Sequence, residues 1–404
     1  MDNNSIINPL SIVNILTLRY DSNLKPNLPI KTWKDFTKTN ESVDINSIEN
    51  SITMYIKQKL ENFDGNVSIA LSGGVDSTLV LSLLRKIRPD IDVQAVSIKF
   101  ANSIDETTDA SKIAKTFDAE HHIVTLDNYL SELPKAISII KMPFWDLHWY
   151  YVVKKSQNLS KILISGDGGD ELFGGYTFRY KKFLSLTTEK SSSMEKVLAY
   201  LECHERDRVP DQEKIFNKKS KFSWELIYQQ LLPYFDNKLS RLEQVFLADY
   251  NGKLLYNFNP INTVVIKNFG MNLLTPILNE KLLLKSPSIQ QSEKYDQVND
   301  IGKIPLRTIL KKNGHDHLVG KQKLGFNVNT INLWKSYGHK LCKDFLSDSR
   351  VVSDGWINNE WIQKYIDNDT LDVKYINKFL GILALEVWYR LFVTKEMNSN
   401  TTLD

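Results

Sequence analysis

Two glycine-rich turns carry residues of this chain that could do chemistry. The first, Ser72-Gly-Gly-Val-Asp-Ser77, follows a short apolar run typical of a buried strand and precedes apolar residues at helical spacing. A strand that turns sharply into a helix leaves unpaired backbone N–H groups at the helix N-terminus, and these favour an anion. Gly73 and Gly74 would let a phosphate approach that backbone, and the Ser72 and Ser77 hydroxyls could donate to it.

Asp76 lies inside this first turn, where a carboxylate would repel a bare phosphate. We therefore expect a divalent cation between the two, since carboxylate and phosphate oxygens are the ligands that magnesium prefers. The turn lacks the lysine and the spacing of a Walker loop. An ordinary strand-to-helix turn without a ligand is the alternative interpretation.

The second turn is Ser165-Gly-Asp-Gly-Gly-Asp170, which follows another apolar run and leads into Glu-Leu-Phe-Gly-Gly-Tyr176. Its small residues would let the backbone approach a ligand closely. Asp167 and Asp170 could face the same cavity as Asp76 and help to hold a metal ion. The alternative is structural, with Asp170 as the N-cap of a short helix that runs through Phe173.

A third segment, Gly320-Lys-Gln-Lys-Leu-Gly-Phe326, is a basic loop that follows a predicted helix over residues 301–312. Lys321 and Lys323 could reach a triphosphate from it. A solvated basic turn without a ligand is the alternative.

The elements that must position these turns alternate between strands and helices. Such alternation predicts an α/β fold with a doubly wound parallel sheet, whose ligands bind beyond the carboxyl ends of the strands. Strands are predicted over residues 67–71, 93–98, 122–126 and 162–164, and helices over 47–61, 78–88, 105–117, 130–140, 301–312 and 377–392. Residues 9–20 are amphipathic. We predict an N-terminal linker segment at 1–50, an α/β core at 51–183 and a mostly helical part at 184–404, with a frayed tail from Thr394.

Composition narrows the class of protein. The 404 residues carry a net charge of +3 without one long basic run, which argues against nucleic acid as a partner. Two cysteines at unrelated positions indicate neither a disulfide framework nor a metal site and fit a reducing compartment. With no secretory signal and no long uncharged apolar run, we expect a cytoplasmic protein that does not bind membranes.

The first turn resembles the pyrophosphate loop SGGxDS of the N-type ATP pyrophosphatases. Together with the second turn and the basic loop, it makes the chain from about Pro9 to Phe392 similar to the synthetase part of class B asparagine synthetases. That resemblance implies an adenine nucleotide alpha hydrolase-like fold. Supporting similarities are His121-His122, Lys303 with Arg307, Lys323-Leu-Gly-Phe326 and Leu385-Glu-Val-Trp-Tyr-Arg390.

The resemblance implies an ATP-dependent ligase that adenylates a carboxylate, releases pyrophosphate and then forms an amide with ammonia or an amine. By position, Asp76 and Asp170 would hold Mg²⁺, Lys323 would stabilise the adenylation transition state, and Asp167 would take a proton from the incoming amine. The remaining residues implied to bind ATP or pyrophosphate are Leu71, Ser72, Gly73, Gly74, Ser77, Ile98, Ser165 and Gly166.

Three differences from the family pattern concern the source of the nitrogen and the identity of the substrate acid. The family's N-terminal glutaminase domain begins with a cysteine after the initiator methionine, whereas position 2 here is Asp2, and only a closing strand at Leu16-Thr-Leu-Arg-Tyr20 resembles that domain. Nitrogen would then come from free ammonia, a separate glutaminase subunit or an amine on a substrate. The other departures are Pro143-Phe-Trp-Asp-Leu-His-Trp149, which carries unexpected aromatic residues, and Asn272-Leu-Leu-Thr-Pro-Ile-Leu-Asn279, which lacks expected charges.

Those two segments are expected on the acceptor side of the site, where the substrate acid binds. The identity of that acid therefore stays open. Aspartate is the default, and a sugar uronate or a natural-product acid is the rival. A non-catalytic nucleotide-binding subunit that partners a glutaminase is a second hypothesis. A tRNA-modifying pyrophosphatase would predict a basic face or zinc cysteines, and the sequence has neither pattern.

Overall fold

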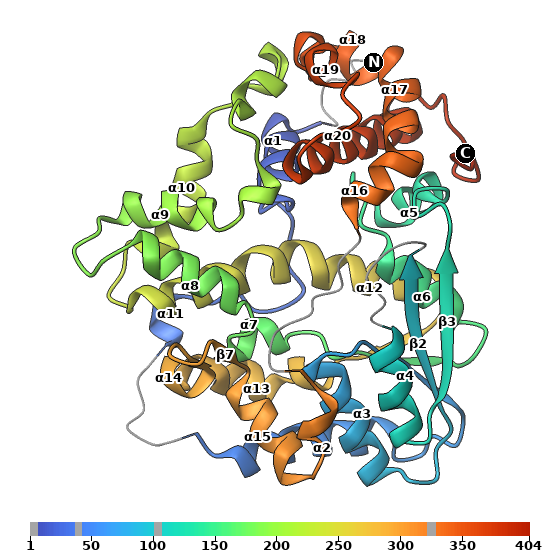
Figure 1. The fold of residues 1–404 in the computed structure, drawn as a ribbon, viewed down its shortest axis with the longest axis vertical. Helices are drawn as coiled ribbons and strands as arrows, with labels where there is room; N and C mark the ends of the chain where they lie inside the picture. The colour runs from blue at the N-terminus through green and yellow to red at the C-terminus, as the bar shows by residue number, and fades with distance from the viewer. Residues whose placement is uncertain (1–6, 37–42, 101–106, 321–328) are drawn as a thin grey trace.

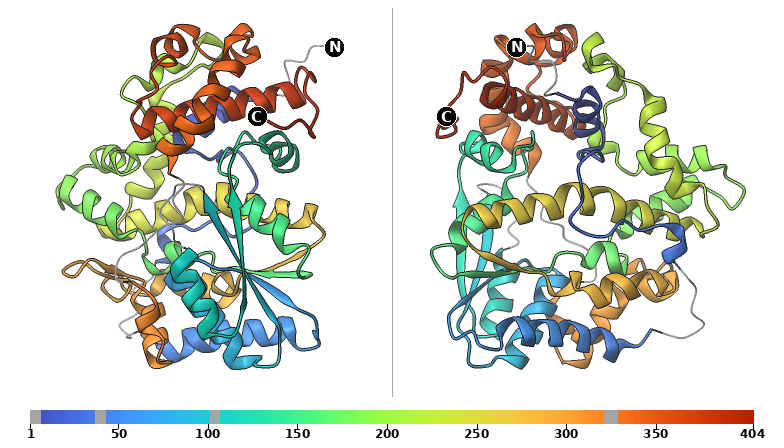
Figure 2. Two further views of the ribbon diagram at one scale, coloured as in Figure 1. Left: turned by 45° about the vertical axis from the view of Figure 1, so that its right-hand side comes forward. Right: turned by 180° about the vertical axis from the view of Figure 1, so that it is seen from behind.

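A five-stranded parallel sheet organises the chain (Figures 1 and 2). The structure is a computed structural model, and it describes residues 7–36, 43–100, 107–320 and 329–404. The strand order is β3-β2-β1-β4-β5. The strands are β1 Val67–Ala70, β2 Val93–Phe100, β3 Glu120–Leu126, β4 Ile162–Ile164 and β5 Asn272–Leu274. This confirms the predicted doubly wound α/β class.

The central strand β1 fixes where a ligand can bind. In its register, Ile69 lies opposite Ala95 of β2 and Ile164 of β4, and all three side chains are fully buried. From β1 the chain first adds β2 and β3 on one side and later returns to add β4 on the other side. The order therefore reverses between β1 and β4, which is the crevice where open α/β sheets bind ligands.

Two groups of helices pack around this sheet. Helix α3 packs with α2 and α15, whereas α6 packs with α12 and against β2. Their bounds are α2 Ile45–Leu60, α3 Val75–Ile87, α4 Thr107–Thr116, α5 Leu133–Ile140, α6 His148–Ser156, α12 Asn259–Asn268 and α15 Ile304–Lys312.

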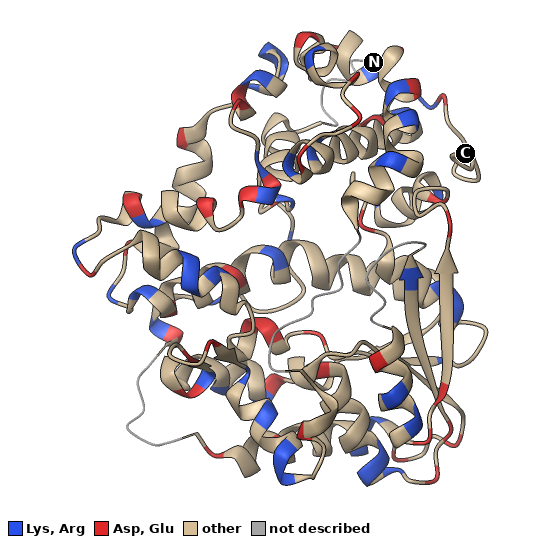
Figure 3. Cartoon of the chain, viewed as in Figure 1, with Lys and Arg blue, Asp and Glu red and all other residues tan. Residues whose placement is uncertain are grey.

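The chain beyond β4 is mostly helical, as predicted. Its α-helices are α7 Gly169–Phe173, α8 Thr177–Leu186, α9 Ser193–Glu202, α10 Trp224–Phe235, α11 Arg241–Asp249, α13 Glu280–Lys285, α14 Gln291–Lys294, α16 Thr330–Leu333, α17 His339–Ser347, α18 Arg350–Ser353, α19 Asn359–Tyr365 and α20 Val373–Phe392. The shorter elements are η2 Trp33–Asp35, η3 Glu205–Asp207, η4 Gln212–Ile215, η5 Lys218–Ser220, the π-helix η6 Tyr250–Phe258, η7 Pro276–Leu278, η8 Ser286–Ser288, η9 Asp316–Leu318, the π-helix η10 Trp334–Gly338 and the hairpin of β6 Tyr295–Asp296 with β7 Ile301–Gly302. Lys/Arg and Asp/Glu segments are interspersed along these elements (Figure 3).

The N-terminal segment differs from its prediction. Leu16 to Tyr20 does not form a strand, because residues Pro9–Leu18 form helix α1. The Asn8 side chain caps its first turn and Pro9 occupies the first helical position, where a missing N–H costs nothing. The left-handed backbone of Arg19 then ends the helix. Leu16 is buried and packs in the same core as α20.

The boundaries of other elements also differ from those predicted. Helix α3 begins at Val75, three residues before its predicted start, and α15 begins at Ile304 because Ile301 and Gly302 pair with β6. The tail is ordered rather than frayed, since Leu403 is buried and its N–H donates to the carbonyl of Ser131. Within the described ranges, the structure contains no helix of the length and apolar character needed to cross a bilayer.

Candidate active site

A cavity of about 450 Å³ opens at the carboxyl ends of β1, β2 and β4. Both glycine-rich turns line it, so the crevice between β1 and β4 holds residues that lie about a hundred positions apart in the sequence. The predicted residues that line the cavity are Leu71, Ser72, Gly73, Gly74, Asp76, Ser77, Ile98, Ser165, Gly166, Asp167 and Asp170. Lys323 lies outside the described residues, and Gly320, the last residue described before it, lines the cavity.

The first turn is held by its own side chains. The N–H of Ser72 donates to Oγ of Ser77 at 3.2 Å, and the N–H of Gly74 donates to Oγ of Ser72 at 3.2 Å. Thr78 closes the turn by donating its hydroxyl to the carbonyl of Gly74 at 2.7 Å. The N-terminus of α3 is thus fixed at the cavity, where its backbone favours an anion.

The second turn runs from β4 into the short helix α7. Ser165 Oγ accepts the N–H of Asp167 at 3.1 Å, which turns the chain away from the sheet. Gly168 is the N-cap of α7. Its φ of 93° is a backbone conformation that favours glycine. The prediction that Asp170 caps this helix is therefore wrong, because Asp170 lies in its first turn with its side chain at the cavity.

Glycine is required where the two turns meet. A Cβ atom on Gly166 would lie 2.8 Å from both the carbonyl carbon of Asp76 and the nitrogen of Ser77. Both are backbone atoms, which cannot rotate away. The close approach of the second turn to the start of α3 therefore depends on the missing side chain.

Lys303 joins the two turns electrostatically, a role that its place in the sequence did not reveal. Its ammonium lies 2.5 Å from Oδ2 of Asp76 and 2.9 Å from Oδ1 of Asp170, and the side chain is 9% exposed. Burial alone would lower the pKa of Lys303, but the carboxylates of Asp170 and Asp76 raise it above its ordinary value. Lys303 is therefore a buried cation held between the predicted metal ligands.

The carboxylates of Asp76 and Asp170 also fit a magnesium ion by chemistry and placement. Their oxygens converge on one cation, the Lys303 ammonium, and carboxylate oxygens are suitable ligands for Mg²⁺. Among the described residues no group of three or more His, Cys, Asp or Glu side chains could hold a metal ion. An ion at this place would therefore take further ligands from phosphate and water, as Mg²⁺ commonly does.

Asp167 lies at a different end of the cavity, beside helices α6 and α12. Its Oδ2 accepts a hydrogen bond from Asn262 Nδ2 at 2.7 Å, and burial raises its pKa above the ordinary value. His148 interacts with it electrostatically and bonds through Nδ1 to Asp146 Oδ1 at 2.7 Å. Burial alone would lower the pKa of His148, but Asp146 raises it.

The two segments that depart from the family pattern have different positions. Phe144, Asp146, His148 and Trp149 line the cavity. Residues 272–279 are absent from the described lining: they form edge strand β5 and a buried turn, and Asn279 caps α13. Residues 272–279 lack charged residues that the family pattern has. Their absence therefore affects packing rather than the described wall of the cavity.

Most of the chain matches a known protein family. The model of the asparagine synthase family matches residues 54–390, which include β1 to β5 and both turns. The chain belongs to this family. Among its curated members, the chain is 22% identical over 367 residues to asparagine synthetase (glutamine-hydrolyzing) 1 of Bacillus subtilis, covering 82% of this chain and 57% of that protein.

Other similarities are shorter or more distant. A putative asparagine synthetase (glutamine-hydrolyzing) 2 of Methanocaldococcus jannaschii is 32% identical over 118 residues, covering 28% of this chain and 23% of that protein. Among solved structures, the NH3-dependent NAD synthetase of Campylobacter jejuni is 18% identical with a TM-score of 0.27, covering 56% of this chain and 94% of that one. The NMN synthetase of Francisella tularensis is 14% identical with a TM-score of 0.26, covering 57% and 94%. The chain thus spans little more than half the length of the Bacillus relative.

Proposed function

We propose that this chain is an ATP-dependent carbon–nitrogen ligase of asparagine synthetase type that forms AMP and pyrophosphate. The observation that carries the proposal is the single cavity in which the serine–glycine turn, the acidic turn and Lys303 meet. Family membership supports an ATP-dependent ligase in general. Aspartate is the family's default acid, and the aromatic segment at Phe144 to Trp149 leaves another carboxylic acid as its rival.

In the first step the substrate carboxylate attacks the α phosphorus of ATP, the bond to the β phosphate breaks, and pyrophosphate leaves. Negative charge grows on the phosphate oxygens during this step. The backbone of Gly73 and Gly74, the α3 N-terminus and the Lys303 ammonium would stabilise it, and their positions at the cavity support this role. Lys323, which follows Gly320 by three residues and could reach about 10 Å from it, is proposed to act on the same charge.

Asp76 and Asp170 are the residues that would hold Mg²⁺, and Leu71, Ile98, Ser165 and Gly166 would contact the adenosine. Bound beside the phosphates, the ion would neutralise part of the charge that pyrophosphate carries away. Lys303 would orient both carboxylates, since it pairs with each of them.

In the second step ammonia or an amine attacks the carbonyl carbon of the acyl-adenylate, the new C–N bond forms, and AMP leaves with the electrons of the broken C–O bond. Asp167 is proposed to accept the proton that the nitrogen loses. Burial raises its pKa, which makes its carboxylate a stronger base than an exposed aspartate. The nitrogen would come from free ammonia, from a separate glutaminase or from an amine substrate.

The proposal is tested by ATP–pyrophosphate exchange across a panel of carboxylic acids that includes aspartate. We expect exchange that depends on one acid and on Mg²⁺, and that is lost in Asp76→Asn and Lys323→Ala. Lys311→Ala is the matched control, because Lys311 is exposed on α15 and does not line the cavity. Exchange with no acid of any class, or full exchange in Asp76→Asn, would contradict the proposal.

A further inference from the structure

The end of the cavity around Asp167 is built from one set of neighbouring groups. Trp149 donates its indole N–H to the carbonyl of Asn262 at 3.3 Å, and the Asn262 side chain donates to Asp167. His148 precedes Trp149 on α6 and interacts with Asp167. This end, which we call the acyl end, therefore comprises His148, Trp149, Asp167 and Asn262 with the side chains beside them.

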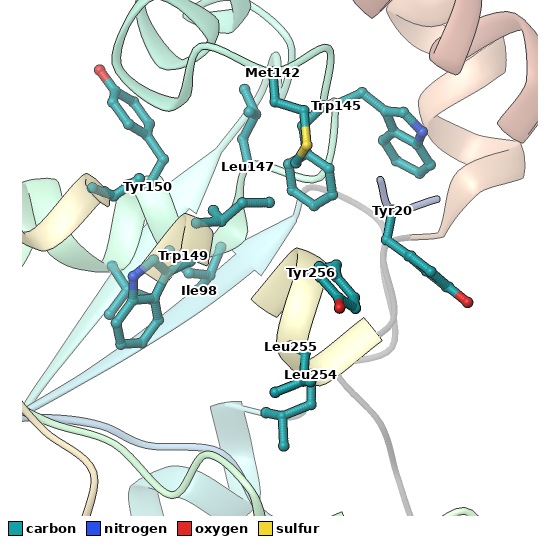
Figure 4. Close-up of a cluster of buried hydrophobic side chains, with 14 of the residues drawn as sticks. Tyr20, Ile98, Met142, Trp145, Leu147, Trp149, Tyr150, Leu254, Leu255 and Tyr256 are labelled. Atoms are coloured by element: carbon teal, nitrogen blue, oxygen red, sulfur yellow. The ribbon is translucent and has the colours of Figure 1, made fainter. Parts of the chain in front are cut away.

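Apolar and aromatic side chains on helices α6 and α12 and on η6 also line the cavity. The π-helix η6 contributes Leu254 and Phe258, and α12 contributes Ile261. Phe144 and Val152 lie before and within α6. Figure 4 shows Trp149, Leu254 and Ile98 in one cluster of buried side chains.

The charges at the acyl end favour a cation or a neutral group over an anion. Its described ionisable side chains are two carboxylates, Asp146 and Asp167, and one imidazole, His148, which is already bonded to Asp146. Arg19 pairs with Asp146 and Asp207 and is absent from the described lining. The other described basic residues of the lining, Lys303 and Arg307, lie with Asp76 at the phosphate end.

From this wall and these charges we propose, on the basis of the proposed function, that the acid activated here is a monocarboxylic acid with an apolar, aryl-sized body rather than aspartate. A second carboxylate on the substrate would face Asp146 and Asp167 inside a largely apolar wall, and leaving such a charge without a partner is costly. An aryl group would instead pack against Trp149, Phe258 and Ile261.

The test measures binding of stable acyl-adenylate mimics, so it does not depend on turnover. The probes are 5′-O-sulfamoyladenosine and its N-(3-phenylpropanoyl), N-succinyl and N-(β-aspartyl) derivatives, each titrated calorimetrically into the full chain. We expect the phenylpropanoyl compound to bind at least about tenfold more tightly than the succinyl compound, the β-aspartyl compound and the parent. A factor of about ten is the low end of the discrimination that an apolar pocket achieves.

A reciprocal variant makes the result specific. Phe258 is partly exposed and lines the cavity, so Phe258→Arg should reduce binding of the phenylpropanoyl compound and strengthen binding of the succinyl compound while leaving the parent unchanged. Phe178→Arg is the matched control, because Phe178 is 59% exposed and does not line the cavity.

Each outcome decides between the two proposals. If the parent binds but the succinyl or β-aspartyl compound binds as tightly as the phenylpropanoyl one, or if no acyl group alters affinity, the inference about the acid is overturned and the nucleotide site stands. If neither the parent nor any derivative binds, the proposed function fails and the inference fails with it.

Discussion

At the scale of single residues, the site depends on charges that are paired before any ligand binds. Lys303 holds Asp76 and Asp170, and Asp146 holds His148. The contacts of Lys303 could not be found from sequence, because Lys303 is separated from Asp76 by 227 residues and only the fold brings them together. The turns themselves were predictable, since glycine, serine and aspartate at short spacing are a local signal.

Replacing Lys303 with Met should leave two carboxylates close together without their cation. Removing one partner of a buried ion pair costs roughly 3–5 kcal/mol, so we expect the free energy of unfolding to fall by that amount and pyrophosphate exchange to be lost. Urea unfolding followed by circular dichroism measures the first effect. Lys311→Met on α15 is exposed and should change stability by no more than about 0.5 kcal/mol. A Lys303→Met variant as stable as the wild type would contradict this account of the pair.

The Asp146–His148 pair predicts a pH-dependent stability. Asp146 and Asp167 raise the pKa of His148, while burial and Arg19 lower it, and the net direction is upward. Because the pKa of His148 is raised in the folded state, protonation of His148 stabilises the fold. This stabilisation is fully present below the pKa of the unfolded state, about 6.5, and is lost as pH rises through the pKa of the folded state.

Asp146→Asn removes the main cause of that upward shift. The difference in free energy of unfolding between wild type and Asp146→Asn should therefore be larger at about pH 5.5 than at about pH 8.5. Urea titrations at both pH values measure it, with His317→Gln as a control at an exposed histidine. A difference that is constant with pH, or that grows toward high pH, would show that the pair does not titrate as described.

At the scale of elements, the strand order places the two turns in contact. The alternation of buried strands with helices predicted the doubly wound parallel class correctly, whereas the strand order itself comes from the structure. Edge strand β5 was missed, since only one of its three residues is buried, whereas all three residues of the equally short β4 are buried. Leu16 to Tyr20 was expected to be a strand because of the family resemblance, whereas the cap at Asn8 and the proline at Pro9 favour the helix α1 that is observed.

Gly166→Ala tests the contact between these elements. Its Cβ would press against the backbone at Asp76 and Ser77, so we expect a loss of about 1–3 kcal/mol in stability and weaker binding of ATP. Gly381→Ala is the control, because its Cβ would meet only the end of the Leu16 side chain at 3.2 Å. Calorimetric titration with ATP measures the effect. Unchanged ATP affinity in Gly166→Ala would mean that the second turn does not shape the nucleotide site.

At the scale of the whole molecule, the first described segment is part of the same core as the last helix. Leu16 of α1 is buried and packs near Gly381 of α20, and its carbonyl accepts hydrogen bonds from the side chains of Gln212 and Lys378. The tail returns to Ser131 near α5. Helix α1 is therefore part of this hydrophobic core, which the polar and apolar pattern of residues 9–20 did not reveal.

Leu16→Ala should accordingly destabilise the entire chain. A buried leucine truncated to alanine costs about 2–5 kcal/mol, and the unfolding transition should remain single if the core is continuous. Urea unfolding monitored by tryptophan fluorescence and circular dichroism measures both features. Leu24→Ala, where the side chain is 42% exposed, should change stability by about 0.5 kcal/mol or less. An equally small change for Leu16→Ala would contradict the placement of α1 in this core.

The central claim is that both glycine turns bind one nucleotide. A crystal structure of the chain with Mg²⁺ and α,β-methylene-ATP tests it most directly. The account predicts the triphosphate between the Gly73–Gly74 backbone and the Asp76, Asp170 and Lys303 side chains, with the adenine against Leu71 and Ile98. A nucleotide that touches only one of the two turns, or that binds outside the cavity, would contradict it.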